Sequence, residues 1–273
     1  MNKPKLPYRL LACDLDGTLM GDDIAISPRV RRSLATAQAR GVYVTLATGR
    51  GFYAARPYAR ELNITVPLIC YQGGVIKDPL SGELLHQVKM DRELVLQAIE
   101  LARARDWHLI VYTQDAAYIQ EFRHNDRFYH AWLGSDIHRV DDLAGMVRQD
   151  GTNLAKFIIV ADKAASDRIQ AEMTARFGQQ MTVVRSHTLF VEGNPLQANK
   201  GAALRRLAAR LNVPQAQVMA IGDQGNDVSM LAWAGLGVAM GNGSEAAQAA
   251  ADWIAPPLSA DGAAVAIERF LLR

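Results

Sequence analysis

Two carboxylates stand directly after an apolar run near the start of the chain. Residues 10–13 (Leu-Leu-Ala-Cys) are typical of a buried parallel strand, and Asp14 and Asp16 follow them. Side chains at i and i+2 of an extended segment lie on the same face, so these acids would be neighbours at the sheet edge where open α/β folds bind ligands. Like charges held together need a cation, a proton or chemistry to compensate them. The pair therefore predicts a nucleophile, an acid/base group and a divalent ion, with a simple strand-ending turn as the alternative.

Three further polar groups stand at the ends of apolar strands or at the start of a helix. Thr48-Gly49-Arg50 follows an expected strand at 42–47, and Lys200 begins an apolar helix. The segment 222–227 (Gly-Asp-Gln-Gly-Asn-Asp) follows an expected strand at 218–221 and places Asp223 and Asp227 four residues apart. Each group alone has an ordinary explanation as a cap, a solvated lysine or a turn. Thr48 and Lys200 gain weight only from their combination with the acidic groups, and together the groups favour chemistry.

Phosphoryl transfer is the chemistry that these groups suit together. It needs a nucleophile, a proton donor for the leaving oxygen, fixed hydrogen-bond donors and a cation that neutralises the phosphate. Asp14, Asp16 and Asp223 offer the hard oxygen ligands that Mg²⁺ prefers, while Thr48 and Lys200 offer a hydroxyl and a positive charge. The sequence has no Walker A lysine motif and no G-x-S-x-G elbow, which argues against a P-loop enzyme and a serine hydrolase of that type.

The elements that must position these residues alternate between strand and helix patterns. This alternation predicts a Rossmann-like α/β fold, with a parallel sheet and helices on both faces. A Ser27 cap followed by Pro28 indicates a helix that ends before Gly41. The expected core strands are 10–13, 42–47, 67–71, 218–221, 235–240 and 252–255, and the expected core helices are 27–40, a segment ending near 62, 199–211 and one beginning at 227.

The middle of the chain differs from the two ends. Turn-rich segments at 78–83 and 192–195 bracket a block that is long enough to form a smaller α/β domain. We therefore expect a core split between residues 1–83 and 193–273, with an inserted cap at 84–192. Within the cap we expect helices at 91–105 and 164–177 and strands at 108–113, 154–161, 181–185 and 188–192, whereas 121–152 has no clear pattern.

Composition limits the classes of partner. The chain has 273 residues, 49% hydrophobic composition and a net charge of +2, with its basic residues dispersed, so no nucleic-acid partner is expected. Cys13 and Cys70 lie in apolar strand-like runs without metal-ligand spacing, which fits a reducing compartment. No secretion signal or membrane-length apolar run is present, so we expect a cytoplasmic protein without membrane attachment.

The four groups, taken in order, resemble the four motifs of the haloacid dehalogenase-like (HAD) hydrolase superfamily. The motifs are Asp14-Leu15-Asp16-Gly17-Thr18, Thr48, Lys200 and the 222–227 segment, and the resemblance covers nearly the whole chain. The large insertion between the second and third motifs is similar to the type IIB α/β cap of Cof-type phosphatases.

The resemblance implies a role for each matching residue. Asp14 would be the nucleophile that forms an aspartyl-phosphate, and Asp16 the general acid/base that also binds Mg²⁺ through its carbonyl. Thr48 and Lys200 would complete the catalytic set by contacting the phosphoryl group. Asp223 and Asp227 would join Asp14 and Asp16 at the metal. The expected phosphate- and substrate-binding residues are Gly17, Thr48, Gly49, Arg50, Gln72, Gly73, Lys200 and Asn226.

Two features bear on the substrate. Cof-type relatives usually carry Asn-Gly-Ala after the third strand, whereas this chain has Gln72-Gly73-Gly74, and the extra methylene places the amide differently. The cap offers several side chains that could contact the leaving group, without a sequence reason to choose among them: Tyr112, Tyr118, Arg123, His124, His130, Trp132 and Lys156.

The function expected from these features is Mg²⁺-dependent hydrolysis of small phosphorylated metabolites, most simply sugar phosphates. A phosphomutase or phosphotransferase, in which a second sugar accepts the phosphoryl group, is the alternative within enzymes. A phospho-accepting signalling receiver also groups acids with Thr and Lys on a parallel sheet, but its sites come in another order and it needs no inserted domain.

Overall fold

The computed structural model describes residues 8–21, 23–134, 136–150 and 153–273. The chain divides into two compact units. The first comprises the chain up to Thr48, Arg56–Leu85 and Asn199–Arg273, and we call it the core. The second comprises Gly49–Ala55 and His86–Ala198, and we call it the cap. A short piece that follows Thr48 thus belongs to the cap by its contacts, although it is far from the rest of the cap in sequence.

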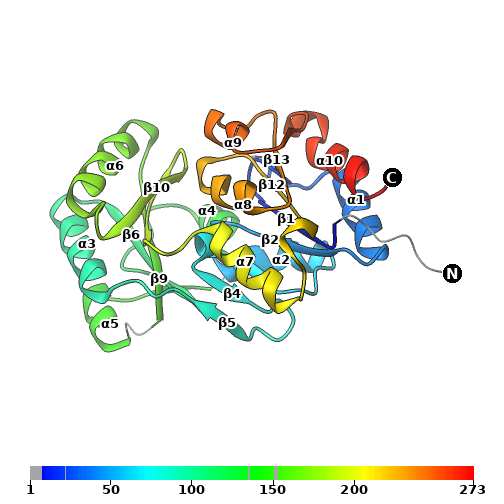
Figure 1. Ribbon diagram of the computed structural model, residues 1–273. Coiled ribbons are helices and arrows are strands. Elements are labelled where there is room, and N and C mark those ends of the chain that lie inside the picture. The colour runs from blue at the N-terminus through cyan, green and yellow to red at the C-terminus, as the bar shows by residue number, and fades with distance from the viewer. Residues whose placement is uncertain (1–7, 22, 135, 151–152) are drawn as a thin grey trace. The chain divides into compact units, whose positions relative to one another are not determined.

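The core is built on a parallel five-stranded sheet with the order β14-β13-β12-β1-β2 (Figure 1). Within this sheet, β1 pairs in parallel with β12 on one side and with the edge strand β2 on the other. Every pairing in the sheet is parallel, as the alternating sequence pattern predicts. The strands are β1 (Leu10–Cys13), β2 (Tyr43–Leu46), β12 (Val218–Gly222), β13 (Leu236–Ala239) and β14 (Trp253–Ile254).

Helices pack on both faces of this sheet, because alternate strand residues are apolar on each side. Leu10 and Ala12 of β1 lie in one cluster with Leu204 and Leu207 of α7, while Leu11 on the opposite face is also fully buried. The predicted Ser27 cap is confirmed, since its side chain accepts a hydrogen bond from the Val30 amide. The core helices are α1 (Pro28–Ala39), α2 (Phe52–Glu61), whose first residues belong to the cap, α7 (Lys200–Arg210), α8 (Val228–Trp233), α9 (Glu245–Ala249) and α10 (Gly262–Phe270).

A second, three-stranded sheet begins with the expected strand that leads to Gln72. Its strands are β3 (Leu68–Cys70), β4 (Val75–Lys77) and β5 (Leu84–Gln87), with β3 and β4 antiparallel. The sequence predicts a strand near β3 but not β4 or β5, because both are too short to show a period. Between β3 and β4 the chain makes a one-turn 3-10 segment, η1 (Tyr71–Gly73). Further 3-10 segments in the described part of the chain include η3 (Gln215–Gln217), η4 (Gly225–Asp227) and η5 (Leu258–Ala260).

The cap contains a mixed six-stranded sheet with the order β10-β11-β9-β6-β7-β8. Pairing is antiparallel except between β7 and β8. The four strands expected from sequence are confirmed. The strands are β6 (His108–Thr113), β7 (Ala117–Ile119), β8 (Ile137–Arg139), β9 (Leu154–Val160), β10 (Met181–His187) and β11 (Phe190–Pro195).

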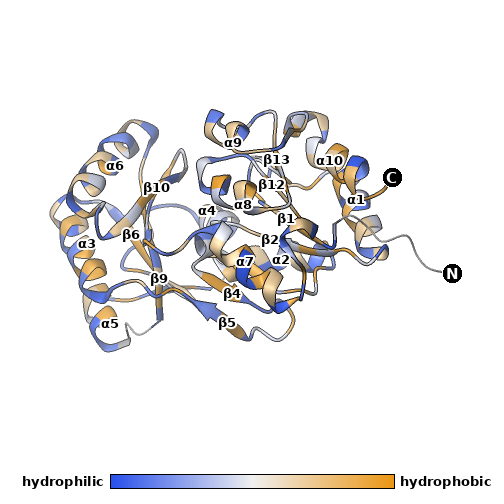
Figure 2. Ribbon diagram, viewed as in Figure 1, coloured by the Kyte–Doolittle hydropathy of each residue, from blue (hydrophilic) through white to orange (hydrophobic). Residues whose placement is uncertain are grey.

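One face of the cap sheet is apolar and carries helices, and the other bears buried polar groups. Phe157 and Ile159 of β9 lie in a single hydrophobic cluster with residues of α3, α5 and α6. In Figure 2, α3 carries both hydrophobic and hydrophilic residues, as expected for a helix with one buried face. On the other face, Lys156 of β9 and Glu192 of β11 are buried. The cap helices are α3 (Arg92–Ala104), α4 (Asp126–Leu133), α5 (Leu143–Asp150) and α6 (Lys163–Phe177).

The segment 121–152, which lacks a clear sequence pattern, is structured over most of its length. It contains α4, β8 and α5, each no longer than 8 residues, and such elements are too short for a periodic signal. Asn125 caps α4 by accepting a hydrogen bond from the Phe128 amide. In the described part of the chain, no helix is both long and apolar enough to cross a membrane.

Candidate active site

The sequence-predicted acids of the core lie where neighbouring strands end. Asp14 follows β1 and Asp223 follows β12, and these two strands are paired. Thr48 lies two residues beyond β2, the other neighbour of β1, and is fully buried. Asp14 and Asp223 are 5% and 2% exposed, so both carboxylates are removed from bulk water. Parallel strands thus bring residues that are more than 200 positions apart to one edge of the sheet.

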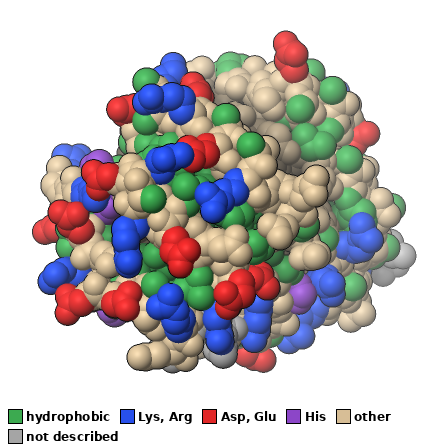
Figure 3. Space-filling view, turned by 90° about the vertical axis from the view of Figure 1, so that its left-hand side faces the viewer, with side chains coloured by type: hydrophobic (Ala, Val, Ile, Leu, Met, Phe, Trp, Pro, Cys, Tyr) green, Lys and Arg blue, Asp and Glu red, His purple; other side chains and the backbone are tan. Residues whose placement is uncertain are grey.

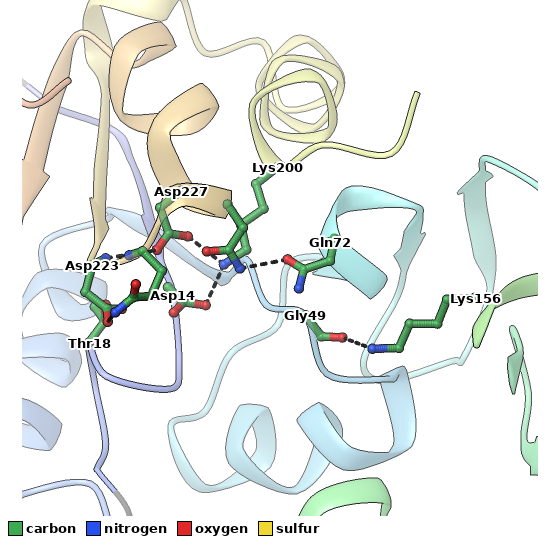
Figure 4. Close-up of polar contacts among 10 residues, drawn as sticks. Asp14, Thr18, Gly49, Gln72, Lys156, Lys200, Asp223 and Asp227 are labelled. Atoms are coloured by element: carbon green, nitrogen blue, oxygen red, sulfur yellow. Dashed lines mark hydrogen bonds and ion pairs between the residues drawn. The ribbon is translucent and has the colours of Figure 1, made fainter. Parts of the chain in front are cut away.

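Lys200 joins two of these carboxylates directly. Its Nζ donates hydrogen bonds to Asp14 Oδ1 and to Asp227 Oδ1, each at 2.6 Å (Figure 4). Lys200 is the first residue of α7 and is 0% exposed. Asn199 caps that helix by accepting from the Ala202 amide, which fixes the point where the lysine leaves the backbone. Lys200 is therefore held in place by two charged hydrogen bonds and is not a solvated surface residue.

Asp227 organises the loop that follows β12. Its Oδ2 accepts hydrogen bonds from the backbone amides of Asp223 at 2.9 Å and Gln224 at 3.0 Å. Its Oδ1 accepts from Lys200, so both oxygens already have donors from the chain. These three hydrogen bonds show that Asp227 orients Lys200 and the Asp223 loop.

Two side chains that sequence reasoning missed hold Asp223. Thr18 Oγ1 donates to Asp223 Oδ1 at 2.8 Å, and Gln224 Nε2 donates to Oδ2 at 3.1 Å. Gly17 has a left-handed φ of +84°, and a Cβ there would lie 2.3 Å from Asp223 Oδ2, so glycine permits this close approach. The position of Thr18, two residues after Asp16 in the same loop, could have indicated that it belongs to the site.

The pKa values of the acids show strong mutual repulsion. Burial raises the pKa of Asp14 well above its usual range, the charges of Asp227, Asp223 and Asp16 raise it further, and Lys200 opposes this. Burial and Asp227 also raise the pKa of Asp223, against hydrogen bonds from Thr18 and Gln224. Burial alone would lower the pKa of Lys200, but its carboxylate partners outweigh burial and raise it.

This charge balance fits a divalent cation. One ligand atom from each of Asp14, Asp223 and Asp227 lies within 4.8 Å of the others, and all three residues are buried. One ammonium faces these three carboxylates and the half-buried Asp16, which adds to the repulsion at Asp14. A hard cation would relieve the repulsion and favour the ionised form of Asp14 that nucleophilic attack requires. The residues present therefore suit a metal with an oxygen ligand set.

Hydrogen bonds link three other predicted core residues, Thr48, Gln72 and Asn226. The Thr48 amide donates to Ile69 O at 2.9 Å, and Thr48 O accepts from the Gln72 amide at 3.2 Å. Asn226 Nδ2 donates to Gln72 Oε1 at 2.8 Å, so the amides of two predicted substrate-binding residues meet. Gly73, the last residue of η1, packs against the backbone at the start of α7.

Gly49 and Arg50, also predicted to bind phosphate, belong to the cap unit and have partners there. Lys156 Nζ donates to Gly49 O at 3.0 Å and forms an ion pair with Glu192 at 2.9 Å, and both members of the pair are buried. The Arg50 guanidinium lies 5.5 Å from the ring centre of Trp132, close enough for a cation–π contact. Lys156 and Trp132, two of the predicted leaving-group residues, therefore contact the short segment that follows Thr48.

Most of the other predicted leaving-group residues contact residues of the cap itself. Arg123 forms ion pairs with Asp106 and Glu121, and the Tyr118 ring packs on His138. The His124 amide donates to the Tyr129 hydroxyl, and His130 is exposed. Tyr112 pairs with Lys156 in the β6–β9 ladder, and its ring lies 5.4 Å from Lys156 Nζ. Among the seven, Tyr112, Trp132 and Lys156 thus form one neighbourhood with Gly49 and Arg50.

Comparisons with known proteins find relatives over most or all of the chain. A model of the haloacid dehalogenase-like hydrolases matches residues 11–267. The 5-amino-6-(5-phospho-D-ribitylamino)uracil phosphatase YcsE of Bacillus subtilis (strain 168) is 30% identical over 274 residues, 100% of this chain and 99% of that protein. The HMP-PP phosphatase of Serratia proteamaculans (strain 568) is 29% identical over 235 residues, 86% of this chain and 84% of that one.

Solved structures show a similar fold over nearly the whole chain. A haloacid dehalogenase-like hydrolase from Bacteroides thetaiotaomicron has a TM-score of 0.83 and 31% identity, covering 96% of this chain and 99% of that one. A HAD subclass IIB sugar phosphatase has a TM-score of 0.80 and 21% identity, covering 96% and 99%, and this likeness concerns the fold alone.

Proposed function

The chain belongs to the haloacid dehalogenase-like hydrolase family, and we propose that it is a phosphatase of small phosphorylated metabolites. The observation that carries the proposal is the Lys200 bridge between Asp14 and Asp227, with Asp223 close by. The named phosphatases at 29–30% identity support the reaction class.

The first half of the proposed reaction is attack by Asp14. A carboxylate oxygen of Asp14 forms a bond to phosphorus while the bond from phosphorus to the leaving oxygen breaks, giving an aspartyl-phosphate. Asp16 gives its proton to the leaving oxygen, which departs as an alcohol. Lys200, held on Asp14, balances the negative charge that gathers on the phosphoryl oxygens.

The second half returns the enzyme to its starting state. Asp16, now ionised, takes a proton from a water molecule as the water oxygen bonds to phosphorus, and the bond between phosphorus and Asp14 breaks. Inorganic phosphate leaves and Asp16 is protonated again. A second carboxyl at this position favours hydrolysis of the phosphoenzyme over its accumulation.

Mg²⁺ is the cation we propose for the acidic cluster. Asp14, Asp223 and the Asp16 carbonyl would hold it, with Asp227 as a further ligand or as the residue that orients Lys200. When bound, the ion would neutralise phosphate charge during transfer. Phosphate binding is assigned in this proposal to the predicted donors of the motif segments: Gly17, Thr48, Gly49, Arg50, Gly73, Lys200 and Asn226.

Sugar or polyol phosphates are the proposed substrates. One relative is named for a phosphoribityl compound and another for HMP-PP, so relatives of similar identity act on different small phosphorylated molecules. The face in Figure 3 mixes acidic and basic side chains instead of showing a continuous basic stripe, which supports a small substrate over a nucleic acid. Tyr112, Trp132 and Lys156 are the cap residues we assign to the leaving group.

The test is a screen of phosphorylated metabolites with Mg²⁺, with EDTA as the control. We expect turnover that EDTA abolishes, and Asp14→Asn lowers kcat at least about a thousandfold because it removes the attacking oxygen. Asp23→Asn, an exposed acid in the same region, is the matched control and keeps full activity.

Three results would contradict the proposal. The first is activity retained in Asp14→Asn, and the second is turnover that EDTA does not affect. The third is a bisphosphorylated intermediate or an acceptor-dependent product, which would indicate a phosphomutase or phosphotransferase instead.

A further inference from the structure

The turn after β3 has an unusual backbone. Tyr71, Gln72 and Gly73 have φ values of 52°, 56° and 92°, so three consecutive residues lie in the left-handed region. Only glycine adopts this region freely, and a tyrosine and a glutamine there are strained. Such strain persists where the surrounding structure determines it, and it concentrates at functional sites.

This turn contacts two of the catalytic segments through its backbone. The Gln72 amide donates to Thr48 O at 3.2 Å. A Cβ on Gly73 would lie 2.2 Å from Asn199 O and 2.8 Å from the Lys200 amide nitrogen, so the turn presses on the first residues of α7. The strained turn therefore sets the spacing between the Thr48 segment and the helix start that carries Lys200.

The Gln72 side chain reaches a third segment. Gln72 is 5% exposed, and its Oε1 accepts from Asn226 Nδ2 at 2.8 Å (Figure 4). Asn226 belongs to the loop that carries Asp223 and Asp227. Its Oδ1 is buried and has no hydrogen-bond partner among the described residues. Leaving a buried acceptor unpaired is unfavourable, which points to a partner outside the chain for the Asn226 amide.

We propose that Gln72 is a positioning residue that acts through Asn226, in place of the substrate contact predicted from sequence. By accepting one Asn226 proton, Gln72 fixes the plane of that amide. The second N–H of Asn226 Nδ2 then donates to a phosphate oxygen, and Oδ1 accepts from a hydroxyl of the phosphate ester. Gln72 itself does not touch the substrate. This inference rests on the proposed phosphatase activity.

The test compares Gln72→Met, Asn226→Ala and the double variant on a substrate that the wild type hydrolyses. Methionine is similar in length to glutamine but cannot accept the Asn226 proton. Losing one buried hydrogen bond in the transition state predicts a roughly tenfold lower kcat, with KM changed less than about twofold. The double variant has the kcat of Asn226→Ala within about twofold, because Gln72 acts only through Asn226.

Two further variants separate this role from a general effect on folding. Gln87→Met, which removes another partly buried glutamine that donates to Asn153 O, is the matched control and leaves kcat unchanged. Gln72→Asn is more compatible with a left-handed backbone but one methylene too short for the Asn226 contact. If Gln72→Met does not fold, Gln72→Asn replaces it in the cycle with the same expectations.

The outcomes distinguish the two proposals. Losses that multiply in the double variant, or a raised KM with unchanged kcat, would mean that Gln72 contacts the substrate itself, and only the positioning role would fall. An unchanged kcat in the Gln72 variant that folds would also overturn that role alone. A wild type that hydrolyses no phosphomonoester would remove the proposed function and this inference with it.

Discussion

At the scale of single residues, Lys200 shows how a buried charge can be tolerated. Its Nζ has two carboxylate partners at 2.6 Å and no exposed surface. Removing one partner of a buried pair costs about 3–5 kcal/mol because the other charge is left unpaired. Here the surplus of carboxylates means that the pair alone does not neutralise the cluster, which is why the same residues suit a cation.

His108 in the cap gives a testable pH dependence. Burial, with a smaller contribution from Arg123 and His124, lowers the pKa of His108 to about 4, although Glu121 opposes the shift. The unfolded chain therefore binds a proton between about pH 6.5 and 4 that the folded chain does not. Acidification from pH 7 to 5 lowers the free energy of unfolding by about 1–2 kcal/mol through this residue.

Urea denaturation of the wild type and His108→Gln at both pH values checks this expectation. Glutamine can still bond to the Tyr129 hydroxyl, which lies 2.9 Å from His108 Nε2, but it does not titrate. The stability difference between pH 7 and 5 is smaller in the variant. His138→Gln, at an exposed position, keeps the wild-type pH dependence; the same dependence in all three proteins would rule out His108 as its source.

At the scale of elements, two glycines with nearly the same φ allow the cost of backbone strain to be measured apart from the cost of side-chain overpacking. Gly73 and Gly41 have φ values of +92° and +91°. A Cβ at Gly41 has nothing within 4 Å, whereas one at Gly73 meets the backbone that begins α7. Gly41→Ala therefore costs only the left-handed strain, about 1–2 kcal/mol.

Gly73→Ala costs the same strain plus overpacking of about 1–3 kcal/mol. It also shifts the start of α7, so kcat falls, whereas Gly41→Ala retains activity. Urea denaturation and steady-state kinetics of both variants check these expectations. Equal stability losses and equal activities in the two variants would contradict the packing argument.

The elements that could be predicted from sequence are those with a clear hydrophobic pattern or a recognisable helix cap. β1, with its apolar run ending at Asp14, and α1, with its Ser27 cap, are examples. β4 and β5 have 3 and 4 residues and depend on their neighbours in the sheet, which no local pattern records. The same limit applies to α4 and α5, which have 8 residues each.

The site also has a part that could be predicted from local sequence and a part that could not. Residues in a motif, such as Asp14 and Asp223, were identifiable because an acid that ends an apolar strand is a local signal. The hydrogen bond from Thr18 to Asp223 spans 205 positions, and that from Asn226 to Gln72 spans 154, so neither can be predicted from local sequence.

At the scale of the whole molecule, each unit has a hydrophobic cluster of its own. Phe157, which is 0% exposed, lies in the cap cluster, and Leu204, also 0% exposed, lies in the core cluster. Among the residues that the structure describes, neither cluster contains residues of the other unit. Separate clusters favour separate cooperative opening, because the free energy that protects an amide comes from the contacts around it.

We therefore expect substitutions in the two clusters to act on different amides. Phe157→Ala removes about 3–5 kcal/mol of packing, and hydrogen exchange becomes faster in β6, β9 and β11 while β1 and β12 keep their protection. Leu204→Ala is the reciprocal variant and has the opposite pattern. Exchange that accelerates equally in both units for either substitution would mean that the chain opens as a single cooperative body, despite having two clusters.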